Sequence, residues 1–433
     1  MSGRIFLSTA FLILFLTPSI FGQEIDRNYL QVEEPSAGNF FGVSARAMGM
    51  GGAQIATAND AAGLVYNPAR LTKVKRIEFS GGMTHQRIEN ETGYTGSTQP
   101  LSSYYQNESI TQSNTRFSSA NIVLPVPTYR GSLVFAAGVN RMMSFDHVFH
   151  STLIDPDLNT IDLDALALET GGINMWSFGG ALDLSPNISV GAAVNYWKGQ
   201  DDYLQEYYIQ PSAKNVSEIR ERNQYLYDYS GWNAKLGLSV DASKFLSLGA
   251  TVDFPTKFSI DQDFNFNYDS TDANTQQEFI SQYEELGNYD LTHPYSFGLG
   301  AALSFKFVTL AGDVYFTDWS QLKPSARSGV DERLYKLIYQ NVTRWHVGAE
   351  FALPELATNL RIGFYEDPIP FKSTYLKTDR RYFTLGAGFL IDQVMTADIA
   401  WNHGIYEFRD DRVNMVKESY TVDKFFLTLA YRL

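Results

Sequence analysis

The chain has 433 residues, no cysteine and a formal net charge of −14. The lack of cysteine excludes a disulfide-stapled scaffold, thiolate chemistry and a lipid anchor attached to cysteine. The acidic balance lacks the basic footprint needed to neutralise phosphates, so we expect no nucleic-acid partner.

The first predicted element is a secretory signal peptide over residues 1–22. Arg4 supplies its positive start, a short apolar run from Ile5 to Leu16 follows, and Gly22 offers a cleavage point. The run is too short to span a bilayer comfortably, which favours a cleaved signal over a membrane anchor. No later segment approaches the ~18 apolar residues of a membrane helix, so an exported protein would cross a membrane only as a closed barrel.

Residues 23–75 form the second predicted unit, a plug or hatch ahead of the barrel. The stretch is rich in Gly and Ala and does not alternate between polar and apolar residues, most clearly from Ser44 to Ala53 and from Asp60 to Leu71. Small residues permit tight turns and close packing. After Arg76 the pattern changes to repeated strands, so residues 76–433 form the predicted barrel domain.

The strands alternate apolar side chains with small or polar ones. In residues 295–307, Tyr295, Phe297 and Leu299 point one way, whereas Ser296 and Gly298 point the other. Transmembrane barrel strands show this period of two, with apolar residues toward lipid and polar residues toward the lumen. The 26 Tyr and 30 Phe fit both strands and the aromatic girdles of such barrels.

Connection lengths favour a membrane barrel over a water-soluble sandwich, which would also alternate. Short connections alternate with long polar segments along the chain; the short ones lie near 185–187, 241–244, 306, 353–358 and 391–394. That asymmetry is typical of outer-membrane barrels, with short periplasmic turns and long outer loops. We count about fourteen strands, near 76–86, 115–126, 131–145, 173–184, 188–199, 224–240, 245–260, 291–305, 307–320, 341–352, 357–365, 381–390, 395–404 and 422–433.

Two further features of the strands and loops yield expectations. The last run, Phe425 to Leu433, would pair with the first strand and so remove both sheet edges. One long loop contains a helix-like stretch from Ile161 to Leu168, with apolar residues on more than one side.

The plug segment resembles a known family. Arg46, the run from Gly49 to Ala53, Asp60 and Asn67-Pro68-Ala69 are similar to the hatch of the FadL/TodX (OMPP1) family of outer-membrane transporters. Two late strands, from Leu310 to Leu322 and from Leu360 to Tyr365, also resemble that family. The chain departs from the usual pattern at its end, because Leu433 stands where outer-membrane strands commonly carry an aromatic residue.

The resemblance implies an all-β, closed, antiparallel transmembrane barrel in the bacterial outer membrane, with the hatch folded inside. It implies passive uptake of hydrophobic compounds, foremost long-chain fatty acids and also aromatic hydrocarbons. The transporter would be a monomer surrounded by outer-membrane lipid, without a cofactor. In the family, ligand leaves sideways through a gap made by a kinked third strand. Here that strand would be 131–145, with Gly138 as the candidate kink.

The resemblance also assigns roles within the hatch. Asn67-Pro68-Ala69 would anchor a hatch that rearranges to open the path, although Asn and Pro equally suit a simple turn into the first strand. Arg46 and Asp60 would tether the hatch to the barrel wall or to each other.

Catalytic chemistry is not expected from this chain. The six histidines are scattered, and the nucleophile elbow G-x-S-x-G is absent. His147 and His150 have a spacing that binds metals on helices, but their surroundings are typical of a strand end and a loop, so we expect no metal site.

The inward-facing cations allow two interpretations. Lys235, Arg344 or Arg361 would bind the anionic head group of a ligand through charge-assisted hydrogen bonds. Alternatively, they pair with lumen carboxylates and hold the strands and the hatch in register. The sequence does not choose among the three residues.

Three rival functions follow from the same sequence. A hatch-bearing barrel would also serve as a docking component of a bacterial protein secretion system. A general diffusion porin is disfavoured because a plug would obstruct it. A secreted carbohydrate-active β protein lacks a credible pair of carboxylates.

Overall fold

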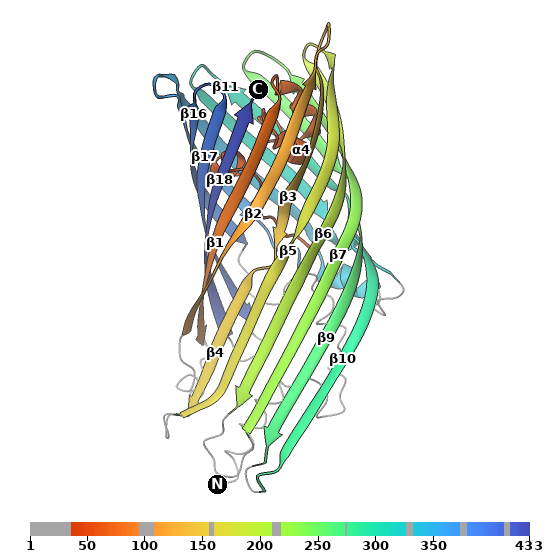
Figure 1. The fold of residues 1–433 in the computed structure, drawn as a ribbon, viewed down its shortest axis with the longest axis vertical. Coiled ribbons are helices and arrows are strands. Elements are labelled where there is room, and N and C mark those ends of the chain that lie inside the picture. The colour runs from red at the N-terminus through yellow and green to blue at the C-terminus, as the bar shows by residue number, and fades with distance from the viewer. Residues whose placement is uncertain are drawn as a thin grey trace.

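The computed structural model describes residues 36–94, 108–155, 160–209, 218–272, 275–325, 332–372, 379–410 and 416–433. These residues form one antiparallel barrel around an N-terminal segment (Figure 1). The predicted signal peptide lies outside the described residues and stays a prediction. Among the residues that the structure describes, no helix is long and apolar enough to span a membrane.

Eighteen strand segments fill fourteen positions, because four positions hold two segments each. The undivided strands are β1 (Glu78–Tyr94), β2 (Glu108–Val126), β5 (Thr160–Ser185), β6 (Ile188–Ile209), β7 (Glu218–Asp241), β14 (Asn341–Leu353), β15 (Thr358–Asp367), β16 (Arg380–Ile391), β17 (Met395–Asp410) and β18 (Val416–Arg432). The divided ones are β3 (Leu133–Ser144) with β4 (His147–Asp155), β8 (Leu246–Asp253) with β9 (Lys257–Thr271), β10 (Glu278–Thr292) with β11 (Ser296–Ser304), and β12 (Val308–Asp318) with β13 (Lys323–Pro324). β1 pairs with both β2 and β18, which confirms the closed fourteen-strand barrel and the pairing of the last strand with the first.

The strands run well beyond the lengths predicted for them, but only at one end of the barrel. β6 and β7 stay paired out to Ile209 and Ile219, and β9 and β10 out to Thr271 and Glu278. Much of the sequence expected to be loop is therefore strand. The expected helix within 161–168 is wrong, because these residues belong to β5 and pair with β4 and β6.

Proline divides two neighbouring strands that the sequence analysis treats as continuous. Pro255 separates β8 from β9, and Pro294 separates β10 from β11. Proline cannot donate to a sheet ladder, so each strand breaks where it occurs. The breaks lie side by side, since the His293 N–H donates to the Thr256 carbonyl oxygen at 2.8 Å.

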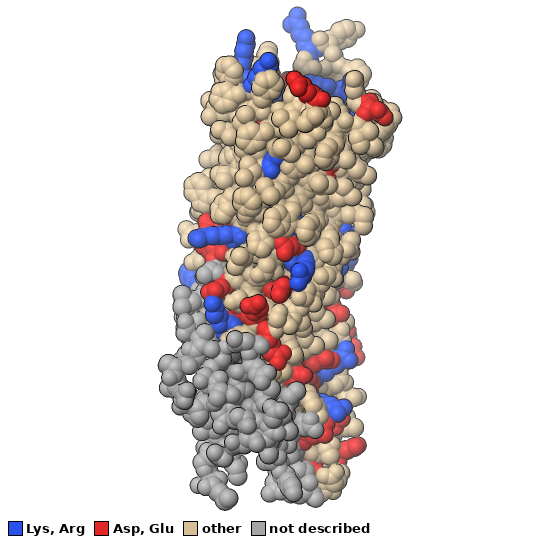
Figure 2. Space-filling model, turned by 90° about the vertical axis from the view of Figure 1, so that its left-hand side faces the viewer, with Lys and Arg blue, Asp and Glu red and all other residues tan. Residues whose placement is uncertain are grey.

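The outer surface carries the apolar residues of the alternating pattern. Along β11, Phe297 and Leu299 are exposed on the outside, whereas Gly298 and Gly300 face inward against Ile55. Figure 2 shows a broad band with few charged side chains across the upper part of one face, with acidic and basic residues crowded below it. An uncharged belt between polar zones is the surface that a bilayer requires.

The N-terminal residues 36–77, here called the inner segment, lie inside the barrel. They contain α3 (Ala45–Gly49), α4 (Gly63–Tyr66) and the 3₁₀ helix η1 (Pro68–Lys73). Three more short helices, η3 (Trp319–Gln321), α5 (Glu332–Ile338) and η5 (Pro354–Leu356), connect wall strands. Figure 1 shows α4 enclosed by strands toward the end where the chain terminates.

Small residues on both sides make this close packing feasible. A Cβ added at Gly348 would collide with the backbone of Met50, and one at Gly363 would collide with the backbone of Gly51. Gly51 itself has a φ of 63°, which favours glycine. The Gly-rich pattern of the inner segment is thus matched by inward glycines of β14 and β15.

We predict that Gly348→Val lowers the stability of the barrel by about 1–3 kcal/mol, because overpacking must displace the inner segment. Urea unfolding followed by tryptophan fluorescence would measure the loss. Gly312→Val is the matched control, since a Cβ there meets its nearest atom only at 3.8 Å. Equal losses in both variants would contradict close packing at Gly348.

Candidate functional site

A chain of alternating charges connects the inner segment to the wall. Arg46 of α3 lies 3.5 Å from Asp60 and 3.5 Å from Glu350 on β14, and it also bonds to Asn59. Glu350 in turn accepts from Arg361 of β15 at 2.7 Å. The geometry therefore contains both tethers that the sequence analysis considered, one within the inner segment and one to the wall.

Arg361 completes this chain from the opposite side. Its second nitrogen lies 2.6 Å from Asp398 on β17, and its side chain is almost fully buried. Two carboxylates thus neutralise each arginine. A buried charge remains tolerable only when it is paired in this way.

The surroundings shift the pKa values of two arginines of the inner segment in opposite directions. Burial alone would lower the pKa of Arg46, but Glu350, Asp60 and Asp398 outweigh it and raise that pKa above its usual range. Burial lowers the pKa of Arg70 to about 10, against the attraction of Asp241. Arg46 is therefore held as a cation by its surroundings.

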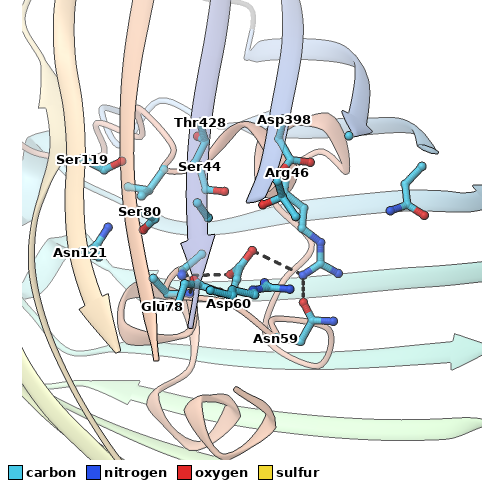
Figure 3. A pocket seen from close by; sticks show the side chains of 18 of the residues that line it. Ser44, Arg46, Asn59, Asp60, Glu78, Ser80, Ser119, Asn121, Asp398 and Thr428 are labelled. Atoms are coloured by element: carbon cyan, nitrogen blue, oxygen red, sulfur yellow. Dashed lines mark hydrogen bonds and ion pairs between the residues drawn. The ribbon is translucent and has the colours of Figure 1, made fainter. Parts of the chain in front are cut away.

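A polar pocket of about 230 Å³ lies between the inner segment and the wall. Figure 3 shows Arg46, Asn59, Asp60 and Glu78 converging on it. Glu78, at the start of β1, accepts from the Ala61 N–H at 2.8 Å and from Arg432 at 2.7 Å. The first and last strands are thereby fixed to the inner segment where they meet.

Asn67-Pro68-Ala69 both turns the chain and contacts the wall. The Asn67 side chain accepts from the Ala69 N–H at 3.1 Å and so caps η1. It donates to the carbonyl oxygens of Ile55 at 2.8 Å and Leu238 of β7 at 3.1 Å. One buried amide therefore joins two parts of the inner segment to a wall strand.

Asp313 of β12 clamps the middle of the inner segment. Its carboxylate accepts the Gln54 and Ile55 N–H groups at 2.6 and 2.8 Å. His346 of β14 lies 2.6 Å from the Gly51 carbonyl oxygen. The alternation places both residues on the inward face, but the sequence gives no sign that their partners are backbone groups.

The three predicted head-group cations all have carboxylate partners. Lys235 lies 3.2 Å from Asp253 and donates to the Val65 carbonyl oxygen at 2.7 Å. Arg344 lies 2.8 Å from Asp367, and Arg361 is paired as described above. These ion pairs favour the register-holding interpretation, and ligand binding by the three residues stays a prediction.

A fourth cation, which the sequence analysis missed, has no such partner. Lys424 of β18 is 5% exposed, and no carboxylate of the described residues lies within ion-pair distance of its Nζ. Its Nζ lies instead 5.0 Å from the Phe41 ring centre and 5.1 Å from that of Tyr382. The sequence does contain a signal that this lysine faces the lumen. Side chains of β18 alternate in direction: the inward ones are Lys424, Phe426 and Thr428, and the outward ones are Phe425, Leu427 and Leu429.

Phe40 and Phe41 lie at the centre of this lumen site. Arg344 stands 4.9 Å over the Phe40 ring, and Arg141 stands 5.7 Å over the Phe41 ring. Tyr365 packs edge-on against Phe40 at 5.5 Å. The site therefore combines apolar rings with cations, as binding an amphiphile requires.

The third strand position bends inward next to this site. β3 pairs with β2 only up to Asn140, its register shifts at Arg141, and it ends at Ser144. Among the described strands, β4 then pairs with β5 alone, while the Asn90 side chain on β1 donates to the Val148 carbonyl oxygen at 2.8 Å. β4 thus lies against the inner face of the wall.

The expected kink at Gly138 is wrong, because Gly138 pairs regularly with Asn121 of β2 and Ser177 of β5. The division falls at Phe145 and Asp146 instead. A glycine in the strand pattern is a weak guide here, because Gly138 serves close contact with the Asn121 side chain.

Aromatic rings line the inner face of the long strand extensions. Tyr225 stacks on Phe264 at 4.4 Å, and Phe266 stacks on Tyr283 at 4.8 Å. Tyr227 leads from this group to the buried Tyr229. The rings form a continuous stripe, here called the aromatic stripe, from β9 and β10 into the lumen.

No group of three or more His, Asp or Glu that could hold a metal ion occurs within the part of the chain that the structure describes. The chemistry of the lumen is that of ion pairs, backbone clamps and aromatic rings.

A closed barrel with an apolar outer belt and a segment folded inside defines a class of outer-membrane channel proteins. Residues 29–418 match the model of the family described as outer membrane protein transport protein (OMPP1/FadL/TodX), so the chain belongs to that family. The protein is therefore an outer-membrane barrel of a transport family, as the sequence resemblance implied.

Solved structures show the same fold at low sequence identity. A Pseudomonas aeruginosa FadL homologue is 15% identical, with a TM-score of 0.63, over 91% of this chain and 99% of its own. The P. putida toluene transporter TodX is 15% identical, with a TM-score of 0.62, over 90% and 99%. The Ralstonia pickettii toluene transporter TbuX is 13% identical, with a TM-score of 0.56, over 91% and 99%. No match was found among curated proteins.

We predict that Arg361→Ala destabilises the barrel by about 3–5 kcal/mol, because it leaves Glu350 and Asp398 buried without their shared cation. The midpoint of urea unfolding would report the loss. Arg381→Ala removes a pair with Glu366 in which the arginine is 65% exposed, so it should leave the unfolding midpoint almost unchanged. Similar costs for the two variants would contradict a structural role for Arg361.

Proposed function

We propose that this protein passively takes up hydrophobic molecules that carry an anionic head group, foremost long-chain fatty acids. The observation that carries the proposal is Lys424, a buried lumen cation that lies against aromatic rings and forms no ion pair within the part of the chain that the structure describes. Family membership supports transport across the outer membrane. The position of Lys424 supports a cargo that carries a negative charge.

An unpaired ammonium in a buried site is unfavourable, and its cost falls when an anion arrives. The rings of Phe41 and Tyr382 supply cation–π attraction, which is weaker than a charge-assisted hydrogen bond to a carboxylate. A fatty-acid carboxylate would displace Phe41 from Lys424 and bind there. Arg141, whose guanidinium carbon lies 5.7 Å from the Phe41 ring centre, would approach the same anion.

The proposed path follows the apolar surfaces. Ligand would collect on the aromatic stripe, move to the rings around Phe40 and Phe41, and leave where β3 gives way to β4. An apolar solute gains by moving into lipid rather than into the periplasm, so no energy source is needed. In this proposal the inner segment acts as the hatch, and its residues at Asn67-Pro68-Ala69 stay anchored while Phe40 and Phe41 move.

A second candidate cargo is the aromatic hydrocarbons. The aromatic stripe favours it, because planar rings stack on Tyr and Phe without any charge. Structures described as the P. putida toluene transporter TodX and as the CymD monoaromatic hydrocarbon channel share the fold. The comparisons give no support to the alternative of a secretion-system docking component.

We predict that Lys424→Gln lowers the uptake of labelled long-chain fatty acid into proteoliposomes by about tenfold, since one charge-assisted hydrogen bond contributes about 1.5–3 kcal/mol. Uptake of labelled toluene should stay unchanged. Lys417→Gln, on the same strand but paired with Glu407, is the control and should leave both rates unchanged.

The outcome separates the two cargoes. If the wild-type protein transports toluene but no fatty acid above empty vesicles, the fatty-acid proposal is overturned. If Lys424→Gln slows both cargoes equally, the lysine serves the structure and not the head group.

A further inference from the structure

Among the strands that the structure describes, β10 has a long edge without a partner outside the membrane belt. β10 pairs with β9 from Glu278 to Thr292. On its other side it meets β13 only at Leu291 and Thr292. The rest of that edge, from Glu278 to Asn288, faces no strand among the described residues.

The ladder pattern identifies which backbone groups are free. The Asp272 N–H donates to the Gln277 carbonyl oxygen, so in this hairpin the odd-numbered residues of β10 bond to β9. The even-numbered residues direct their N–H and C=O groups away from β9, toward the free edge of the sheet. Asp290 fits this pattern, because its N–H and C=O both bond to Ser325.

The even-numbered residues below Asp290 have no backbone partner among the described residues. They are Glu278, Ile280, Gln282, Glu284, Leu286 and Asn288. Their side chains point away from the lumen, since Phe279 and Tyr283 pair with the inward face of β9. Ile280 is 61% exposed and Leu286 is 73% exposed. A long edge with exposed apolar residues is the template that proteins normally protect.

The hairpin around this edge is strongly acidic. Residues 257–292 contain eight acidic residues and one basic residue, Lys257. Lys257 lies 3.0 Å from Asp290 and is therefore already paired. Within the described residues, the edge thus offers backbone groups without partners, two apolar side chains and carboxylates without a paired cation, such as Glu284.

We propose that the β10 edge is a docking site for an extended, basic strand of another protein at the cell surface. Backbone hydrogen bonds would add that strand to the sheet. Its outward side chains would alternate apolar residues, against Ile280 and Leu286, with Lys or Arg against Glu278 and Glu284. This site is separate from the lumen and does not depend on the cargo.

A second copy of this chain fits the edge poorly. Two copies in one membrane share one orientation, so their β10 strands would pair in parallel. Glu278 and Glu284 would then approach their own copies, and like charges opposite each other are destabilising. The charge balance therefore favours a basic partner.

The test uses the full-length protein in lipid vesicles and two fluorescent peptides. On one face, made by every second residue, one peptide carries both Lys and Val, and the other carries both Glu and Val. The basic peptide should bind and should slow amide hydrogen exchange across residues 278–290. The acidic peptide should do neither. Binding of the basic peptide with no change in exchange would overturn strand addition.

Variants separate strand addition from simple charge attraction. Gln282→Pro removes a free N–H while leaving the β9 ladder intact, and it should weaken the basic peptide about tenfold. Glu284→Lys should weaken it as well. Glu355→Lys, an exposed charge reversal at the short-turn end, should have no effect. An unchanged midpoint of urea unfolding would show that the variants fold.

Three other results would overturn the proposal. Equal peptide affinity for Gln282→Pro and wild type would show that the free edge is not used. Disulfide-linked dimers of Gln282→Cys in vesicles would assign the edge to a second copy. Slowed exchange at 278–290 in vesicles with lipopolysaccharide and no peptide would assign it to lipid.

Discussion

The structure depends on the neutralisation of buried charges between the inner segment and the wall, with Glu350 at the centre. Arg46 and Arg361 approach this one carboxylate from opposite sides, and Asp60 and Asp398 complete the chain. Removing either arginine leaves buried carboxylates without one of their cations, which costs several kcal/mol. A polar lumen therefore binds its inner segment in one position, whereas an apolar lumen would allow it to slide.

The sequence predicted the wall well because membrane burial leaves one periodic signal in every strand. Period two located all fourteen positions, and the Gly-rich stretch located the inner segment. The predictions that failed mostly concern residues whose conformation depends on partners distant in sequence. Residues 161–168 look helical alone, but β4 and β6 flank them, and pairing decides their conformation. The divisions at Pro255 and Pro294 were also missed, although the missing N–H of proline marks both positions in the sequence.

The candidate site was likewise only partly predictable from the sequence. Inward-facing cations were predictable, but their partners were not, since Lys235 and Asp253, or Arg361 and Asp398, meet only after the barrel closes. Lys424 looks like any other inward lysine in the sequence. It becomes distinctive only in the fold, where its neighbours are Phe41 and Tyr382. A site defined by the absence of a partner needs the whole set of neighbours before it can be recognised.

The divided strands and the lumen site are physically connected. The Phe41 N–H bonds to the Met142 carbonyl oxygen, three residues before the division at Phe145. Phe145 packs on Tyr229 at 5.5 Å, and rings continue through Phe258 to His293 at the opposite division. Displacing Phe41 from Lys424 would therefore release a hydrogen bond to the third strand. A ligand that binds the lysine would loosen the wall where the proposed exit begins, which couples arrival to departure without any other energy source.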